Sequence, residues 1–218
     1  MPTFELLNIA TIHGQIAPVV DRLLGAEGFV SVKPLQWVRS ATAPIRCVFG
    51  YWQLKGGVVA PRWGYSLDFV PHLSGGKIRW HRTEKSVVLD AWVDGQGTAL
   101  NLYYMYGVLG LLDGMIPRVE AAVDACHSFW GQATTAREVF DQVTTLRSSA
   151  VADIHTQLPI AAALCHAFAG RETEGRREME HFIATRAPRE EAIPKLWEIF
   201  ERAVADGYSG PRTGATTN

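Results

Sequence analysis

Five short runs of β-branched and aromatic residues, separated by short turns, are the feature that most constrains the fold of this chain. The runs cover residues 29–39, 45–54, 63–72, 78–83 and 87–93, and Gly- or Pro-containing segments lie between most of them. Strands joined by such short turns run antiparallel, because a parallel return needs a crossover of about a dozen or more residues. The sequence therefore predicts an antiparallel meander of about five strands.

The apolar period changes to that of helices on both sides of this region. A helix is expected over residues 15–24, with Pro18 in its first turn. Further helices are expected over residues 117–130, from Thr135 with its capping-box partner Glu138, and over residues 158–169, 173–186 and about 194–207. The predicted fold class is α+β, in which an N-terminal helix and the meander precede four to five helices that pack on one face of the sheet.

The chain has 218 residues, of which 47% are hydrophobic, and this is enough for one sizeable core. We expect residues 1–98 and 99–208 to be fused as one domain, followed by a flexible tail over residues 209–218. Five of the seven tryptophans lie in the strand region, and we expect them to build much of the core. They are Trp37, Trp52, Trp63, Trp80 and Trp92.

Cysteine use and charge limit the possible surroundings and partners. Cys47, Cys126 and Cys165 lie in apolar contexts and are odd in number, which indicates reduced thiols and a cytoplasmic address. We expect a bacterial-type protein. The first residues show no secretory signal. The apolar stretch over residues 99–116 is barely long enough to span a membrane and lacks a basic flank, so we prefer a buried helix and turn.

The 21 Lys and Arg are nearly balanced by 22 Asp and Glu, so the chain has no large net charge that would attract it to nucleic acid or to a membrane surface. Residues 77–85 do interleave cations with an aromatic, in the manner of single-strand binders. Because Trp80 is assigned to the core and the chain is slightly acidic, we expect neither a nucleic-acid nor a membrane partner.

The sequence gives little support for the common nucleotide-binding and catalytic motifs. The segment over residues 95–97 lacks the third glycine of a dinucleotide fingerprint and follows a meander instead of a βαβ unit. The segment over residues 74–77 resembles the end of a phosphate loop, but it fits a hairpin turn better. Serine-hydrolase, zincin and paired C-x-x-C motifs do not occur in the sequence. No cofactor is expected.

Two cysteine–histidine pairs, at residues 126–127 and 165–166, suggest a nucleophile and its base. Adjacent residues on a helix diverge by about 100°, so neither pair can make that contact within itself. The Glu-x-x-His spacing at residues 178–181 lacks the second copy that a carboxylate-bridged metal site needs. A core cysteine beside a peripheral histidine, and a solvated helix face, explain these residues.

The hairpin over residues 67–83 carries the one polar patch that remains a candidate site. Its apolar residues share a face if Phe69 lies opposite Trp80 and Pro71 opposite Ile78. The other face then presents Asp68, Val70, His72, Lys77, Arg79, His81 and Thr83.

In this register Asp68 lies directly opposite His81, close enough to hydrogen-bond and to favour the protonated imidazole. With His72 and Arg79 beside them, the patch could bind an anion, or a metal through two histidines and one carboxylate. A solvated sheet face without function is the simpler interpretation.

The absence of catalytic motifs favours a non-enzymatic binding or interaction module. Such a module would use the exposed sheet face, with His72, Lys77 and Arg79 as ligand-binding residues, or the helical hairpin over residues 158–186. Its partner would be a small ligand, another protein or a second copy of the chain. The alternative is a metal- or acid-base-dependent enzyme centred on Asp68, His72 and His81.

Overall fold

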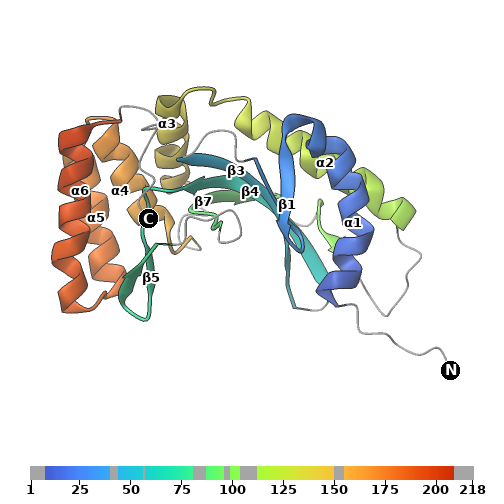
Figure 1. The fold of residues 1–218 in the computed structure, drawn as a ribbon, viewed down its shortest axis with the longest axis horizontal. Coiled ribbons are helices and arrows are strands. Elements are labelled where there is room, and N and C mark those ends of the chain that lie inside the picture. The colour runs from blue at the N-terminus through green and yellow to red at the C-terminus, as the bar shows by residue number, and fades with distance from the viewer. Residues whose placement is uncertain are drawn as a thin grey trace, which may run out of the picture. The chain divides into compact units, whose positions relative to one another are not determined.

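A computed structural model describes residues 8–39, 44–55, 57–80, 87–95, 99–103, 112–149 and 155–208. Its helices and antiparallel strands confirm the α+β class (Figure 1). The chain divides into two compact units that interleave along the sequence. Unit 1 contains Met1–Ala41, Arg46–Tyr65 and Trp92–Gly131, and unit 2 contains Thr42–Ile45, Ser66–Ala91 and Gln132–Asn218. The predicted boundary at residue 98 stays a prediction, and residues 209–218, expected to be a tail, lie outside the described residues.

Unit 1 is built on an antiparallel sheet whose strand order is β1-β2-β3-β4-β7, with β8 also paired to β4. The strands are β1 (Phe29–Lys33), β2 (Gln36–Arg39), β3 (Ile45–Gln53), β4 (Val58–Leu67), β7 (Ala91–Asp94) and β8 (Leu102–Tyr103). The first four follow one another in sequence and in space. The predicted meander of about five strands is therefore confirmed.

The single run predicted over residues 29–39 is in fact two strands, β1 and β2. The chain reverses at Pro34 and Leu35, where proline has no N–H to offer a ladder and Leu35 has φ of 62°. The strands then pair Phe29 with Arg39 and Ser31 with Trp37. A proline inside an otherwise strand-like run marked this turn.

Helices α1 (Ile9–Leu24) and α2 (Leu112–Trp130) pack on one face of this sheet. The indole N–H of Trp37 donates to Asp21 of α1 at 2.7 Å. The indole N–H of Trp130, at the end of α2, donates to the carbonyl of Gly64 at 3.3 Å, and its ring stacks on Phe29 with centroids 5.1 Å apart. These contacts define the helix-covered face of the sheet.

Both helices begin earlier than predicted. α1 begins directly after Asn8, whose side chain accepts a backbone N–H of the first turn, and α2 begins at residue 112. Pro18 and Pro117 therefore lie inside their helices and not in the first turn. Ile12 and Ile16 are buried, so the packed stripe of α1 continues N-terminal to Pro18. The burial of this stripe extends α1 beyond Pro18, although a proline usually marks the first turn of a helix.

The apolar stretch over residues 99–116 contains strand β8 and the start of α2, which corrects the expected buried helix and turn. Residues 104–111 of this stretch lie outside the described residues. Within the described part of the chain, no helix combines the length and the apolar character that a membrane crossing requires.

Unit 2 contains helices α3 (Ala136–Arg147), α4 (Leu158–Phe168), α5 (Glu172–Arg186) and α6 (Ile193–Asp206), and the hairpin of β5 (His72–Ser74) with β6 (Lys77–Arg79). α4 contacts each of the other three helices, which explains why it is apolar nearly all round. The capping box is confirmed, because Thr135 accepts the N–H of Glu138 and the Glu138 carboxylate accepts the N–H of Thr135. All four predicted helices of this region are present.

Gly175 allows the close approach of α5 to its neighbours. A Cβ at this position would lie 2.8 Å from the ring of Phe200 and 2.9 Å from the carbonyl oxygen of Ala163. We expect Gly175→Ala to lower the free energy of unfolding by about 1–3 kcal/mol through overpacking. Alanine is the better helix former by about 1 kcal/mol, so packing must outweigh propensity here.

Gly14 of α1 is the matched control, because an added Cβ meets nothing within 4 Å. Gly14→Ala should raise the free energy of unfolding by up to about 1 kcal/mol. Denaturant unfolding of both variants measures the difference. Two shifts of the same sign would contradict the packing explanation.

Candidate functional site

The β5–β6 hairpin is tighter than predicted. The paired residues are His72 and Arg79, Leu73 and Ile78, and Ser74 and Lys77. The turn consists of Gly75 and Gly76, whose φ values of 58° and 76° are the positive values that two-residue hairpin turns require. The expected pairing of Phe69 with Trp80 is therefore wrong, and the true register differs from it by two residues.

The structure places the residues of the predicted patch in different environments. His72 and Arg79 share one face of the hairpin with Lys77, and of these only His72 is half-buried. Asp68 lies in the turn after β4 and not on a strand of the hairpin, and its N–H donates to a backbone carbonyl at 2.8 Å. His81 lies outside the described residues. The structure thus gathers the three ligand-binding candidates but gives Asp68 no place in the hairpin ladder.

The carboxylate beside His72 belongs to Asp90, which sequence analysis missed. Asp90 is 1% exposed, and its Oδ2 accepts the N–H of Leu67 at 2.7 Å. Its Oδ1 lies 3.8 Å from Nε2 of His72. The available signal was an acid inside the apolar run over residues 87–93. Among the described residues, no group of three His, Cys, Asp or Glu side chains is arranged to hold a metal ion.

The tryptophans do not share one environment. Trp37 and Trp63 are 0% and 3% exposed, as core residues should be, whereas Trp52 and Trp92 are half-buried. Trp80 is 51% exposed, so its assignment to the core is wrong. The hairpin ladder ends at Arg79, and Trp80 lies just beyond it without a paired residue opposite.

A stack of Trp52, Arg62 and Trp92, here called the Trp–Arg stack, lies on three neighbouring strands of unit 1. The guanidinium carbon of Arg62 is 3.9 Å from the ring centroid of Trp92 and 5.4 Å from that of Trp52. Side chains alternate along a strand, and Phe49 of the helix-covered face is an odd number of residues from Trp52. The stack therefore lies on the face opposite to α1 and α2.

The Arg62 guanidinium has an unusual electrostatic setting. Burial lowers the pKa of Arg62 from its ordinary value, and the Asp94 carboxylate partly offsets this effect. Its Nε is buried, and within the described part of the chain the guanidinium has no hydrogen bond or ion pair. Arginine stays protonated at neutral pH. The stack therefore holds a charged, planar donor group in place without saturating its donors.

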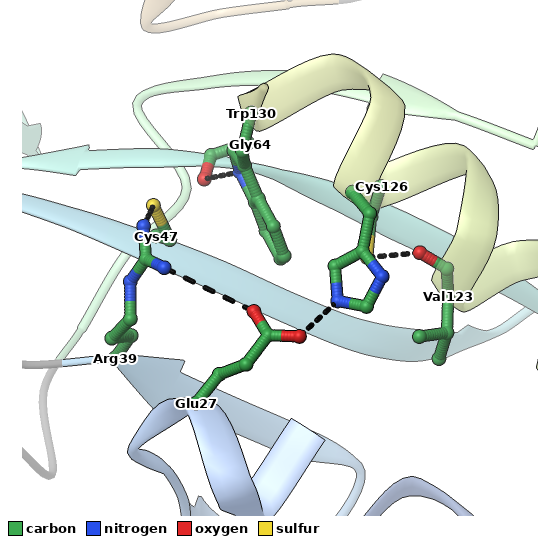
Figure 2. Close-up of polar contacts among 8 residues, drawn as sticks. Glu27, Arg39, Cys47, Gly64, Val123, Cys126 and Trp130 are labelled. Atoms are coloured by element: carbon green, nitrogen blue, oxygen red, sulfur yellow. Dashed lines mark hydrogen bonds and ion pairs between the residues drawn. The ribbon is translucent and has the colours of Figure 1, made fainter. Parts of the chain in front are cut away.

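A polar cluster surrounds two of the cysteines in unit 1, and Figure 2 shows the Glu27 carboxylate at its centre. One oxygen of Glu27 lies 2.7 Å from Nε2 of His127, and the other lies 4.0 Å from Nη1 of Arg39. The second terminal nitrogen of Arg39 donates to Sγ of Cys47 at 3.2 Å. A guanidinium cannot accept a proton, so His127 cannot deprotonate Cys47 through this chain of contacts.

The buried thiols are not activated nucleophiles. Burial raises the pKa of Cys47, although the Arg39 guanidinium opposes this shift. Burial also raises the pKa of Cys126, whose thiol donates to the carbonyl of Val123 at 3.0 Å, while the adjacent His127 contacts Glu27. Cys165 is 0% exposed, and burial raises its pKa well above the ordinary value. All three groups are thiols at neutral pH.

These thiols should react slowly with Ellman's reagent in the native protein at neutral pH, because reaction needs both access and thiolate. Denaturation in concentrated guanidinium chloride should release all three. Rapid native reaction of one thiol would contradict the inert assignment. Cys47→Ser would then show whether the thiol beside Arg39 is the reactive one.

Comparison with known proteins adds no assignment. The chain matches no family model, no curated protein and no solved structure. The His72–Asp90 pair, the Trp–Arg stack and the Glu27 cluster are the side-chain groups from which a function can be inferred.

Proposed function

We propose that this protein is a non-enzymatic binding module that holds a small anionic ligand at the Trp–Arg stack. The observation that carries the proposal is the Arg62 guanidinium, stacked on Trp92 at 3.9 Å and without a hydrogen-bonding partner among the described residues. A half-buried guanidinium whose N–H groups have no acceptor costs stability, and because Asp94 offsets only part of that cost, an anion from solution would offset more of it.

The two indoles determine which part of Arg62 remains available. The guanidinium carbon lies 3.9 Å from the ring centroid of Trp92 and 5.4 Å from that of Trp52, and the N–H donors of a guanidinium project in its plane. We infer that the two indoles hold the guanidinium in place and that its N–H donors are available to a ligand. A carboxylate or phosphate matches these donors, because two of its oxygens can accept two parallel N–H bonds.

The surroundings also favour a small ligand over a polyanion. The chain carries a net charge of −1, so it offers no broad positive field for a nucleic acid. Asp94 lies near enough to raise the pKa of Arg62, so its carboxylate already offsets part of the guanidinium charge, and a ligand with one anionic group suits the remaining charge better than an extended negative surface. One guanidinium between two indoles suits a single carboxylate or phosphate group. The free buried thiols further support a reducing, cytoplasmic setting for this module.

The test is calorimetric titration with inorganic phosphate and with benzoate at constant ionic strength. Both should bind the wild-type protein, and Arg62→Gln should abolish binding of both. Arg62→Lys keeps the charge but loses the planar fork, so it should weaken binding by about tenfold, or about 1.4 kcal/mol. Trp92→Leu should weaken benzoate more than phosphate, because it removes an aromatic surface.

Arg22→Gln is the matched control. Arg22 belongs to the same unit, but it is well exposed and paired with Glu120 at 3.0 Å. Its replacement should leave both titrations unchanged. Absence of binding to the wild type, or equal binding to Arg62→Gln, would reject the proposal.

A second candidate function is acid-base or metal chemistry in unit 2. The observation that favours it is the buried Asp90 carboxylate, whose Oδ1 lies 3.8 Å from Nε2 of the half-buried His72. Such a pair can orient an imidazole for proton transfer. Asp90 replaces Asp68 as the acid of this hypothesis. A metal site would need a further ligand, for which His81 remains the proposed residue.

For this second function, titration with Zn²⁺ should raise the melting temperature of the wild-type protein, because a ligand of the native state stabilises it. The increase should disappear in His72→Ala and in His81→Ala. His181→Ala on the exposed surface of α5 is the control and should retain it. An unchanged increase in His72→Ala would eliminate the metal form of the hypothesis.

A further inference from the structure

A cavity of about 350 Å³ in unit 2 has no part in the functions proposed above. Its lining comes from the β5–β6 hairpin, from the residues that precede α4 and from the end of α5. The lining residues are Leu73, Gly76, Thr156, Gln157, Phe182, Arg186 and Ala187. Pockets for small ligands span roughly 300–1,000 Å³, so this cavity can hold a compound of the size of a sugar.

The turn of the hairpin is held against the segment that follows α5. The N–H of Arg189 donates to the carbonyl of Gly76 at 3.3 Å, and its Nε donates to the carbonyl of Gly75 at 3.1 Å. The approach is close, because a Cβ on Gly76 would lie 2.7 Å from Cγ of Arg189. These contacts join the hairpin and the end of α5, which both contribute to the cavity wall.

Arg186 is the only charged residue among the described lining residues. Its Nε donates to the carbonyl of Thr156 at 3.1 Å, and this bond holds the guanidinium at the wall. Within the described part of the chain, its two terminal nitrogens make no hydrogen bond or ion pair. A guanidinium held in this way can donate two parallel N–H bonds to a carboxylate or a phosphate.

Two helix ends beside the cavity carry partial charges of opposite sign. Gln157 is the N-cap of α4, whose first turn contains no acidic residue, and the N-terminal end of a helix carries a positive charge of about half an electron. Ala187 is the C-cap of α5, where the partial charge is negative and of similar size. Because these two effects oppose each other, the full charge of Arg186 decides the preference. The cavity favours an anion.

The other polar groups of the lining favour an occupant with hydroxyl groups. Oε1 of Gln157 is buried and accepts no hydrogen bond from the described residues, and the side chain does not cap α4. The Thr156 hydroxyl likewise has no hydrogen bond in the described part of the chain. Phe182 is 0% exposed, so it offers an occupant little aromatic surface. An amide and a hydroxyl without partners gain more from a polar occupant than from an apolar one.

We propose that this cavity binds a small hydroxylated anion, namely a sugar that carries one phosphate or carboxylate group. Arg186 binds the anionic group, and Gln157 and Thr156 exchange hydrogen bonds with the hydroxyl groups. The ligand class differs from that of the Trp–Arg stack, where two indoles offer apolar surface beside the charge. An apolar body in this cavity would leave the Gln157 amide without a partner.

The test is calorimetric titration of the full-length Arg62→Gln variant, in which the Trp–Arg stack cannot bind an anion. The two anionic probes are glucose 6-phosphate and glucuronate, and glucose is their neutral counterpart. At least one anionic sugar should bind about tenfold or more tightly than glucose, a difference of about 1.4 kcal/mol. Hexyl phosphate and cyclohexanecarboxylate carry the same charged groups on apolar bodies. Each should bind several fold more weakly than the sugar with the same anionic group.

Two further variants separate the charge from the amide. Arg186→Gln should abolish binding of the anionic sugars, both in the wild-type chain and in the Arg62→Gln chain. Gln157→Leu should weaken the sugars by several fold and leave the apolar anions unchanged. Arg177→Gln is the matched control, because Arg177 is an exposed arginine of the same helix as Arg186 but lies outside the cavity lining. It should alter no titration.

The proposal is overturned if neither anionic sugar binds, or if glucose binds as tightly as both of them. Unaltered binding in Arg186→Gln would also overturn it, because the anion would then lie elsewhere. Tighter binding of the apolar anions would reject the hydroxylated ligand class. The outcome does not depend on the Trp–Arg stack, so this test and the titrations with phosphate and benzoate succeed or fail separately.

Discussion

Burial of Trp37 is the constraint on which the helix-covered face of the sheet in unit 1 depends. The side chain is 0% exposed, and its N–H would cost free energy if it had no acceptor. Asp21 of α1 provides that acceptor at 2.7 Å, and the ring contacts His13 of the same helix. Across the β2–β3 ladder Trp37 lies opposite Phe49. The Trp37 indole thus contributes both to the position of α1 on the sheet and to the register between β2 and β3.

That arrangement also separates the candidate groups by face. Trp37, Arg39 and Cys47 share the helix-covered face through the β2–β3 register, and there the Arg39 guanidinium has polar neighbours. Arg39 contacts both Glu27 and the thiol of Cys47. Arg62 lies on the other face, where two indoles surround its guanidinium but no described group accepts its hydrogen bonds. The contrast between these two arginines is what directs the functional proposal to the face opposite to α1 and α2.

The amino-acid sequence was sufficient for the helices of unit 2 and for the existence of the meander. The capping box at Thr135 is a local signal, and the structure retains it. The site was harder to predict because it depends on long-range pairing. Because the turn consists only of Gly75 and Gly76, the hairpin register differs by two residues from the predicted one. Asp68 lies outside the strands of the hairpin. Asp90 reaches His72 from a different segment, which no local pattern reveals.

The tryptophans show why composition alone misplaced part of the site. An indole combines a large apolar surface with one N–H donor, so it is stable in the core, on a cation or partly exposed at the surface. Trp37 and Trp130 adopt the first state because a carboxylate and a carbonyl accept their N–H groups. Trp92 adopts the second state, beside Arg62. Trp80 adopts the third because the ladder ends before it. Sequence alternation assigns each indole to a side of a strand, but the covering helices and the end of the ladder decide which sides remain open to a ligand.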